Sequence, residues 1–594
     1  MLKNKSGKTN TGQSFIYGAA VMMISTALVK VIGAIFKIPL TSIIGVTGMG
    51  YFSVAYDLYV PIYTLAMAGL PVAISRIVAE RLAQKRYKDV RMSLRVVKKT
   101  FLTTGIAGFV IMLAASYPFV TITTGNIDSL WGILVIAPSL LFCCIMSTYR
   151  GYYEGFKNMY PTAISSVIEA LGKLVIGYTA ALVTVGFAKS EFAKYGTVFG
   201  RIVQIDSGDS VKALELAIAP YAAAAAILGI TVGSALGALY LVLKYRRRGD
   251  DITEEQLAAS PDPETAKQTF KLIISIAIPV VLGSLTTNIA SLIDVAMVQN
   301  QLANVMESNG AAIREMYSGC ISPEFKDDEV VTMLYGCYKG VAFSIYNLVP
   351  TITQVLGVSA IPALATAWAG KKAGEVKSSV ESVLKISALI AMPCGIGIAV
   401  LAGNILPLLY SGDSLSELQI AIPILRVLGV TAVFSGMMVP MTNMLQAIGK
   451  QIVPVRNIAV GAALKIIINY VLVGIPGINI NGASVGTMVC YVYIFTANLY
   501  SLLKYSKVRV DVKTVFIKPL LSAAACGGAA FVVAKVLPGF VGSNTIITVA
   551  AIGAAGLVYI AALLALRAVS YDDVASFPKG AKLAAWMQKH RLIA

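Results

Sequence analysis

Long apolar runs separated by short polar segments make up almost the whole chain. A helix needs about 20 mostly apolar residues to cross the hydrocarbon core of a membrane. Fourteen runs meet this requirement, and they predict an all-α, polytopic membrane protein with 14 transmembrane helices. The expected spans are 14–43, 51–75, 100–122, 129–149, 161–187, 213–243, 270–299, 331–353, 379–410, 418–446, 453–475, 483–503, 514–536 and 543–566.

The second of these runs has a broken middle. It follows a glycine-rich turn, Gly45 to Gly50, and it is interrupted by Asp57, Pro61 and Pro71 before a basic block begins at Arg76. Prolines and a carboxylate are tolerated at membrane depth only where the helix faces protein or a water-filled cavity. The segment is therefore expected to line a polar cavity inside the protein.

The polar segments between the runs predict the orientation of the chain. If the N-terminus is cytoplasmic, the inner segments hold 36 Lys and Arg residues and the outer loops hold 7. Lys and Arg accumulate in cytoplasmic loops of membrane proteins. Both termini are therefore expected in the cytoplasm, and the basic N-terminal stretch reads as the lead-in to a retained first helix rather than a cleaved signal.

Two halves of the chain resemble each other weakly. Gly155–Tyr178 and Gly449–Tyr470 share a glycine, a lysine, a proline and an intramembrane lysine, Lys173 in one and Lys465 in the other. Repeated lobes around a central site are a common transporter design, although chance similarity between apolar helices is the alternative. The pattern predicts two pseudo-symmetric six-helix lobes plus a terminal helix pair. The expected division is a cytoplasmic N-terminus at 1–13, an N-lobe at 14–243, a cytoplasmic linker at 244–269, a C-lobe at 270–505, the last helix pair at 506–568 and a cytoplasmic amphipathic tail at 569–594.

Composition narrows the class further. Of 594 residues, 57% are hydrophobic and 13% are charged, with a mean hydropathy of +0.75. The net charge of +19 lies in blocks between apolar runs, so it indicates topology rather than nucleic acid binding. One histidine, His590, excludes histidine metal sites and Ser-His triads, and the chain is not expected to be an enzyme. Cys320 and Cys337 flank an outer loop, and whether they form a disulfide stays open.

Charged residues inside the spans are the candidate site. A charge at mid-bilayer costs about 3 kcal/mol on the insertion scale, so each needs a reason. Glu169 and Lys173 are spaced i,i+4 and are expected to pair with each other. Asp294 shares a helix stripe with Ser284, Asn288 and Ser291. The expected cationic residues are Lys30, Lys37, Lys173, Lys339, Arg426 and Lys465, and the expected coupling or organising residues are Asp57, Glu169 and Asp294.

These nine residues carry a net charge of +3. Unpaired cations in a low-dielectric cavity favour an anionic ligand such as a pyrophosphate, because amines act as point-charge phosphate binders. For Lys37, Lys339 and Arg426 the alternative is that the side chains reach from helix ends to the membrane interface. No phosphate-binding loop is present, so an ion gradient of Na+ or H+, the membrane potential or the substrate gradient would drive transport, without a cofactor or metal.

Three stretches resemble a known family. AGLPVAISRIVAE (Ala68–Glu80), LVKVIGAIFKIPL (Leu28–Leu40) and RGYYEGFKNMYPTAISSVIEALGK (Arg150–Lys173) resemble the stage V sporulation protein B and lipid II flippase (MurJ-type) family. That family belongs to the multidrug/oligosaccharidyl-lipid/polysaccharide (MOP) exporter superfamily. Lysine stands at Lys30 and Lys173 where the family usually has arginine, so charge is kept while bidentate geometry is lost.

The resemblance implies alternating-access transport of an undecaprenyl-pyrophosphate-linked cell-wall precursor, or a related polysaccharide lipid, across the bacterial cytoplasmic membrane. It implies that Lys30, Lys37 and Lys173 bind the pyrophosphate, and that Asp57 and Glu169 organise them. The expected partners are this lipid-linked anion and membrane lipids, with no nucleic acid, and a monomer is expected. The alternative is a cation-coupled small-molecule or drug antiporter of the same superfamily. A role specific to sporulation or general to cell-wall growth stays open.

Overall fold

The computed structural model describes residues 15–67, 69–123, 125–205, 209–250, 252–410, 415–569 and residue 588. The expected N-terminal segment 1–13 and almost all of the expected tail 569–594, including His590, lie outside the described residues. Helices make up most of the described chain, and its only strands form one hairpin of two-residue strands, β1 (Thr197–Val198) and β2 (Arg201–Ile202). The expected all-α class is confirmed.

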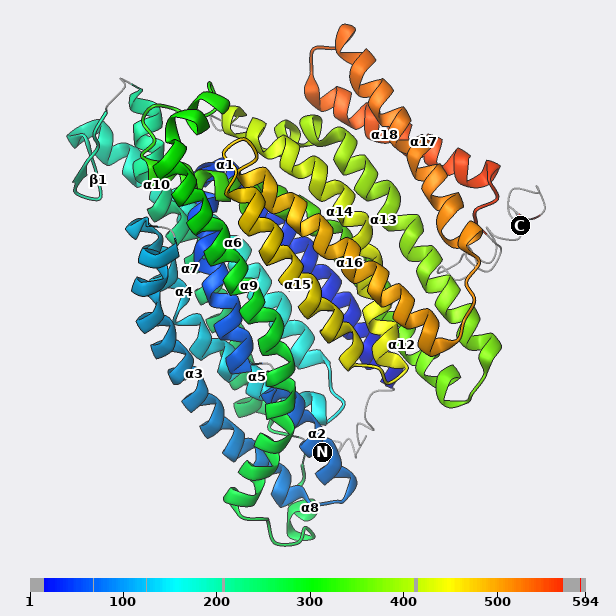
Figure 1. Cartoon of the computed structure of the whole chain (residues 1–594). Coiled ribbons are helices and arrows are strands. Elements are labelled where there is room, and N and C mark those ends of the chain that lie inside the picture. The colour runs from blue at the N-terminus through cyan, green and yellow to red at the C-terminus, as the bar shows by residue number, and fades with distance from the viewer. Residues whose placement is uncertain are drawn as a thin grey trace, which may run out of the picture.

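The N-lobe is the blue and cyan part of Figure 1. It is built from α1 (Phe15–Met67), α2 (Leu70–Ala83), α3 (Tyr87–Thr123), η1 (Ile127–Ser129), α4 (Leu130–Ile136), α5 (Ser139–Gly155), α6 (Tyr160–Tyr195) and α7 (Ser210–Arg248). Within it, α6 packs on α7, α3 packs on α5, and α1 packs on α6. Pro161 stands in the first turn of α6, where its missing N–H leaves no bond unmade.

The C-lobe repeats this pairing with later helices. It contains α9 (Ala266–Met316), α10 (Asp327–Tyr335), the π-helical stretch η2 (Gly336–Ala342), α11 (Phe343–Tyr346), α12 (Leu348–Ala369), α13 (Ala373–Leu409), α14 (Leu415–Ala447), α15 (Ile452–Val473) and α16 (Ile480–Ser506). Here α15 packs on α16, α13 packs on α14, and α9 packs on α15. The same order of contacts in both lobes supports the repeat that the sequence predicted.

The predicted spans coincide largely with helices of the described residues, while the count of fourteen stays a prediction. Among the described residues, eleven helices are long and apolar enough to cross a membrane, and the chain is a multi-pass membrane protein. One of the eleven runs from Ile24 to Ala83 and holds a backbone break at Gly45, where φ is 72° and ψ is 174°. Glycine reaches this left-handed region without a Cβ clash, so the chain reverses there between the first and second predicted spans.

The two lobes touch closely beside this break. A Cβ placed on Gly50 would overlap the carbonyl oxygen of Thr332 in α10, and one placed on Gly336 would overlap the carbonyl oxygen of Val46. A Cβ on Gly340 would lie 2.6 Å from the Cβ of Met49. Small residues let the second half of α1 and the α10–η2 segment approach backbone to backbone.

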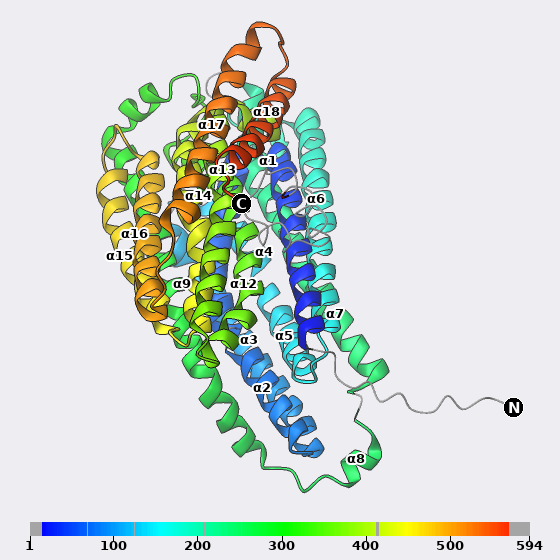
Figure 2. The same cartoon turned by 90° about the vertical axis from the view of Figure 1, so that its right-hand side faces the viewer.

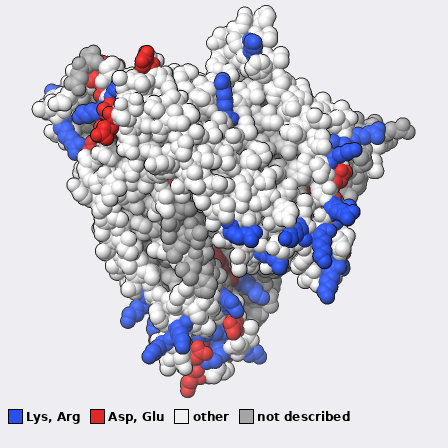
Figure 3. Space-filling model, viewed as in Figure 1, with Lys and Arg blue, Asp and Glu red and all other residues white. Residues whose placement is uncertain are grey.

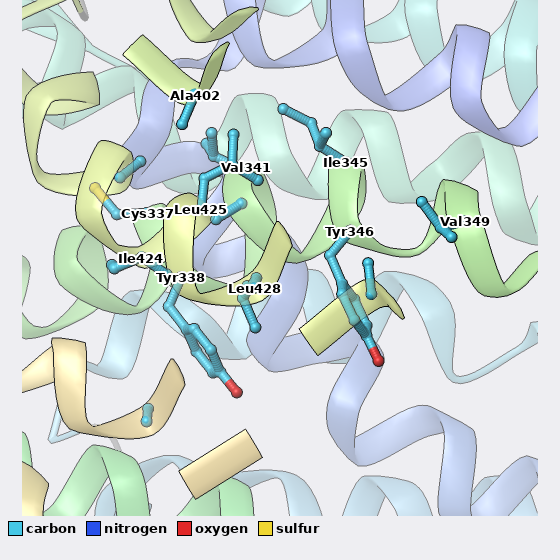
Figure 4. Close-up of a cluster of buried hydrophobic side chains, with 14 of the residues drawn as sticks. Cys337, Tyr338, Val341, Ile345, Tyr346, Val349, Ala402, Ile424, Leu425 and Leu428 are labelled. Atoms are coloured by element: carbon cyan, nitrogen blue, oxygen red, sulfur yellow. The ribbon is translucent and has the colours of Figure 1, made fainter. Parts of the chain in front are cut away.

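The largest buried apolar cluster lies in the C-lobe, and Figure 4 shows part of it. Val341 of η2 packs with Ile424 and Leu425 of α14, while the rings of Tyr338 and Tyr346 point away from them on one side. The Tyr338 hydroxyl lies 2.8 Å from Thr487 Oγ1 in α16, so this ring ties η2 to a third element. The cluster therefore fixes the position of the π-helical stretch that carries Lys339.

The last helix pair lies on the outside of the C-lobe (Figures 1 and 2). It consists of η3 (Lys513–Ile517), α17 (Lys518–Val536), η4 (Leu537–Gly539) and α18 (Asn544–Ala565), and it packs mainly on α13. The Asn544 and Asn404 side chains bond to each other, and Tyr559 donates to the carbonyl oxygen of Leu389. Leu557 on the outer face is 72% exposed, as suits a lipid-facing helix.

Charged side chains gather at the ends of the molecule on the face shown in Figure 3, and a broad area between them carries none. This distribution is typical of a protein whose middle lies in a lipid bilayer. In Figure 3, Lys and Arg predominate at the lower end and on the right.

The predicted linker packs against the N-lobe helices α2 and α3. The helix α7 continues to Arg248, the short α8 (Glu254–Ala258) follows, and α9 begins at Ala266. Buried Arg81 of α2 bonds Glu264 at 2.6 Å and Thr269 Oγ1 at 3.2 Å, and Asp250 accepts from Arg91 of α3. Ion pairs therefore hold the predicted linker on the α2–α3 hairpin.

Candidate functional site

The candidate site lies between and within the lobes, on helices from both halves of the chain. The structure places the nine predicted residues as follows: Lys30, Lys37 and Asp57 on α1, Glu169 and Lys173 on α6, Asp294 on α9, Lys339 on η2, Arg426 on α14 and Lys465 on α15.

A polar seam joins the lobes at Asp57. Tyr335 donates to its carboxylate at 2.5 Å, and the ammonium of Lys339 lies 3.5 Å from the other oxygen. Lys37 donates to Ser344 Oγ at 3.4 Å across the same boundary. The π-helical turn that holds Lys339 widens the helix and turns this side chain toward α1, a device frequent at functional sites.

A second ion pair lies inside the C-lobe. The Lys465 ammonium lies 2.6 Å from Asp294, and Asn469 donates its amide to the same carboxylate at 2.7 Å. The side chains of Lys465 and Asp294 are 16% and 9% exposed, so the pair is largely out of solvent. The serine and asparagine neighbours predicted for Asp294 have side chains outside the described part of the structure.

Glu169 pairs with a residue that the sequence did not single out as part of the site. Arg150 of α5 lies 3.0 Å from its carboxylate, and Ser234 donates to the other oxygen at 3.4 Å. The prediction that Glu169 and Lys173 form an i,i+4 ion pair is wrong. The Glu169 carboxylate pairs with Arg150 from the neighbouring helix instead. The stretch Arg150–Lys173 drew attention as a motif, but Arg150 was assigned to the cytoplasmic side.

Lys173 and Lys37 form no ion pair with any described carboxylate. The Lys173 ammonium lies 4.9 Å from the ring centre of Phe36 and 5.6 Å from that of Tyr56. Such contacts supply a cation–π attraction but no opposite charge. The lobes differ here. In the C-lobe, Asp294 of the first helix forms an ion pair with Lys465, whereas in the N-lobe the first helix contacts Lys173 only through aromatic rings.

A cavity of about 450 Å³ opens beside Lys173. Its walls come from both halves of α1, from α5, from α6 and from α7. The polar lining side chains are Tyr56, Tyr59, Tyr63, Thr64, Arg150, Ser166, Glu169 and Lys173. This confirms that the second predicted span, with its proline and its carboxylate, borders a polar cavity.

Two predicted residues lie away from this cavity. Lys30 and Arg426 are exposed, and neither lines this cavity. Their assignment as substrate-binding residues stays a prediction. Cys320 and Cys337 are both free thiols, so the structure contains no disulfide between them.

The interior charges still sum to a cation excess. Lys37, Lys173, Lys339, Lys465 and Arg150 face Asp57, Glu169 and Asp294, which leaves a net charge of +2 at these positions. In the described residues, no group of three or more His, Cys, Asp or Glu is placed to hold a metal ion. The arrangement suits an anion that offers two negative charges to two ammonium groups.

Two family models match separate parts of the chain. Residues 15–205 match the model described as "Polysaccharide biosynthesis protein", and residues 339–471 match the model MatE. Together they cover α1 to α6 in one lobe and η2 to α15 in the other.

The relatives match along nearly the full length. The chain is 22% identical to stage V sporulation protein B of Bacillus subtilis (strain 168), over 95% of this chain and 98% of that protein. It is also 22% identical to the lipid II flippase MurJ of the same organism, over 80% of each. The solved structure of a lipid II flippase MurJ in an inward closed conformation superposes with a TM-score of 0.60 at 13% identity, covering 92% of this chain and 98% of that one.

Proposed function

We propose that this chain is a member of the multidrug/oligosaccharidyl-lipid/polysaccharide (MOP) exporter superfamily and a flippase for a lipid-linked cell-wall precursor. The substrate is an undecaprenyl-pyrophosphate-linked sugar, lipid II-like or a related polysaccharide lipid. The chain performs no bond-breaking chemistry, and it acts as a monomer in the bacterial cytoplasmic membrane with both termini inside.

The observation that carries this proposal is that two ammonium groups, those of Lys37 and Lys173, form no ion pair with a described carboxylate. Lys173 lines the 450 Å³ cavity and Lys37 donates to Ser344 at the boundary between the lobes, and the pyrophosphate of such a lipid is a diester with two negative charges. Each phosphate group can take one ammonium without displacing an existing ion pair. The three carboxylates of the site are already neutralised by Lys339, Lys465 and Arg150.

Alternating access follows from where the lobes meet. In this state they are joined at the Gly45–Gly50 end, by the glycine contacts and by an ion pair between Lys212 of α7 and buried Glu417 of α14. With the termini inside, this end faces outward, and we propose that the head group enters from the cytoplasmic side. Separation of Asp57 from Tyr335 and Lys339 then opens the outer end.

The prenyl tail stays in lipid while the head group crosses. The α17–α18 pair has an exposed apolar surface and stands beside α13, so it can border the path of the tail. We propose no bound cofactor, and coupling through an ion gradient of Na+ or H+ or through the membrane potential.

The MatE match over 339–471 keeps a second candidate, a cation-coupled small-molecule or drug antiporter. Such a protein needs a carboxylate free to take a cation. Because Asp57, Glu169 and Asp294 each have a resident cationic partner, the flippase fits the site better.

Reconstitution tests the proposal. The purified protein is placed in liposomes, and transfer of fluorescent lipid II between leaflets is measured under an imposed potential or ion gradient. Wild-type transfer that is lost in Lys173→Glu supports a cationic path, and Lys30→Glu in parallel tests whether the exposed lysine takes part. If the folded wild type moves no prenyl pyrophosphate sugar but exports organic cations, the antiporter replaces the flippase.

A further inference from the structure

One wall of the cavity is a stack of aromatic rings. Phe52, Tyr56, Tyr59 and Tyr63 follow one another along the second half of α1. Their ring centres are 6.1 Å apart between Phe52 and Tyr56, 5.9 Å between Tyr56 and Tyr59, and 5.4 Å between Tyr59 and Tyr63. Spacings of this size are those of mutually packed aromatic side chains.

The rings of this stack have different surroundings. Phe52 is 1% exposed and Tyr59 is 5% exposed, and the Tyr59 hydroxyl lies 3.6 Å from the Cys143 sulfur. Tyr56 and Tyr63 are only half-buried, and both line the cavity. Neither hydroxyl has a hydrogen-bond partner among the described residues. The buried rings therefore hold two tyrosines rigidly with their free hydroxyls at the cavity wall.

Polar groups of both signs surround these two rings. The Lys173 ammonium lies over Tyr56, and the Arg150–Glu169 pair and Ser166 complete the lining. A sugar ring presents C–H groups on its faces and hydroxyl or amide groups on its edge. Flat aromatic rings contact the faces, while carboxylate, guanidinium and tyrosine hydroxyl groups bond to the edge. The volume falls in the range of about 300–1,000 Å³ that is usual for ligand pockets.

We infer that Tyr56 and Tyr63 form a sugar-binding subsite for the glycosyl residue attached to the pyrophosphate. This rests on the proposed function and deepens it: the lysines take the pyrophosphate, and the tyrosine wall takes the first sugar. The consequence is selection between loaded and empty carrier lipid. A prenyl pyrophosphate without a sugar contacts Lys37 and Lys173 but leaves the wall unoccupied.

Binding in detergent or nanodiscs tests this inference with two probes. The first is a prenyl pyrophosphate that carries one N-acetylhexosamine, and the second is the matching diester with a methyl group in place of the sugar, so that both probes carry two negative charges. Wild type is expected to bind the first more tightly. Tyr63→Leu and Tyr56→Leu are expected to weaken binding of the first about three- to tenfold and to leave the second unchanged. Tyr63→Phe keeps the ring and is expected to retain most of the preference.

Two controls separate the subsite from the rest of the site. Tyr117→Leu removes a tyrosine that is 60% exposed on α3, and it is expected to change neither affinity. Lys173→Gln is expected to weaken both probes alike. Equal wild-type affinity for the two probes overturns the inference, and so does an equal loss for both probes in the leucine variants. A wild type that binds neither probe overturns the proposed function itself.

Discussion

Lys173 and Lys465 stand at matching positions of the two lobes, yet only Lys465 has a carboxylate partner. The sequence predicted both lysines inside the membrane and their correspondence, since the spacing of a lysine after a proline is local. It did not predict their partners, because Asp294, Phe36 and Tyr56 come from helices far away in the chain. The same limit explains Arg150: a basic residue directly after a predicted span indicates topology until the fold shows Glu169 opposite it.

Removal of Asp294 is predicted to destabilise the protein. Asp294→Asn leaves the Lys465 ammonium in a largely buried place without its counter-charge, which costs about 3 kcal/mol or more when one partner of a buried pair is removed. Thermal unfolding in detergent checks this. The double variant Asp294→Leu with Lys465→Met removes both charges and is expected to recover most of the loss. A double variant as unstable as the single one contradicts the explanation.

Removal of the Lys173 charge is predicted to reduce substrate binding without reducing stability. Lys173 has no carboxylate partner, so Lys173→Gln deletes a positive charge that no part of the described fold needs. The affinity for a prenyl pyrophosphate is expected to fall about tenfold, the usual value of one charge-assisted contact of about 1.4 kcal/mol. The unfolding temperature is expected to stay the same or rise. A lower unfolding temperature with unchanged affinity would assign Lys173 a structural role.

At the scale of elements, the boundary between α1 and the α10–η2 segment carries the contact between lobes. Hydrophobic runs and the glycine-rich turn predicted the helices and the reversal near Gly45. These patterns did not predict that Gly50 and Gly336 face each other from different lobes, because glycine has no side chain from which a contact could be inferred. The π-helical stretch also escaped prediction, since one inserted residue hardly changes an apolar pattern.

A methyl group at this boundary is predicted to push the lobes apart. In Gly50→Ala the added Cβ would overlap the backbone of Thr332, and overpacking of this kind costs about 1–3 kcal/mol. Cys337, buried beside Gly336, is expected to react faster with a maleimide in a variant that keeps only this cysteine. Gly33→Ala is the matched control, because no atom lies within 4 Å of the added Cβ. Equal reactivity of Cys337 in both variants would exclude the close packing.

At the scale of the whole molecule, the connection between lobes is part of the structure. Polar composition indicates a linker between the predicted lobes, but composition cannot distinguish a solvated segment from a docked one. Docking depends on Arg81, whose guanidinium donates to Ser93 in α3 as well as to Glu264 and Thr269. These partners are separated by up to 188 positions in the chain, so no local pattern reveals them.

Loss of the Glu264 carboxylate is predicted to loosen this connection. Glu264→Gln removes the charge that Arg81 and Arg86 share. Trypsin is then expected to cut the segment between α7 and α9 several-fold faster, since cleavage follows the population of the open form. Glu255→Gln in α8 changes an exposed glutamate of the same segment and is expected to have no effect. Identical cleavage of both variants would show that the ion pairs do not hold the linker.

Under the proposed function, the two lysines without a carboxylate partner also make the transport cycle sensitive to voltage. Empty, the site holds a net charge of +2, and with a pyrophosphate diester bound it is close to neutral. One elementary charge that crosses the whole membrane field gains about 2.3 kcal/mol per 100 mV. A voltage that is negative inside therefore acts little on the loaded step and pulls the empty, positively charged site back toward the cytoplasm. The lysines proposed to bind the substrate would then also allow the resting membrane potential to drive the empty site back to its cytoplasm-facing state.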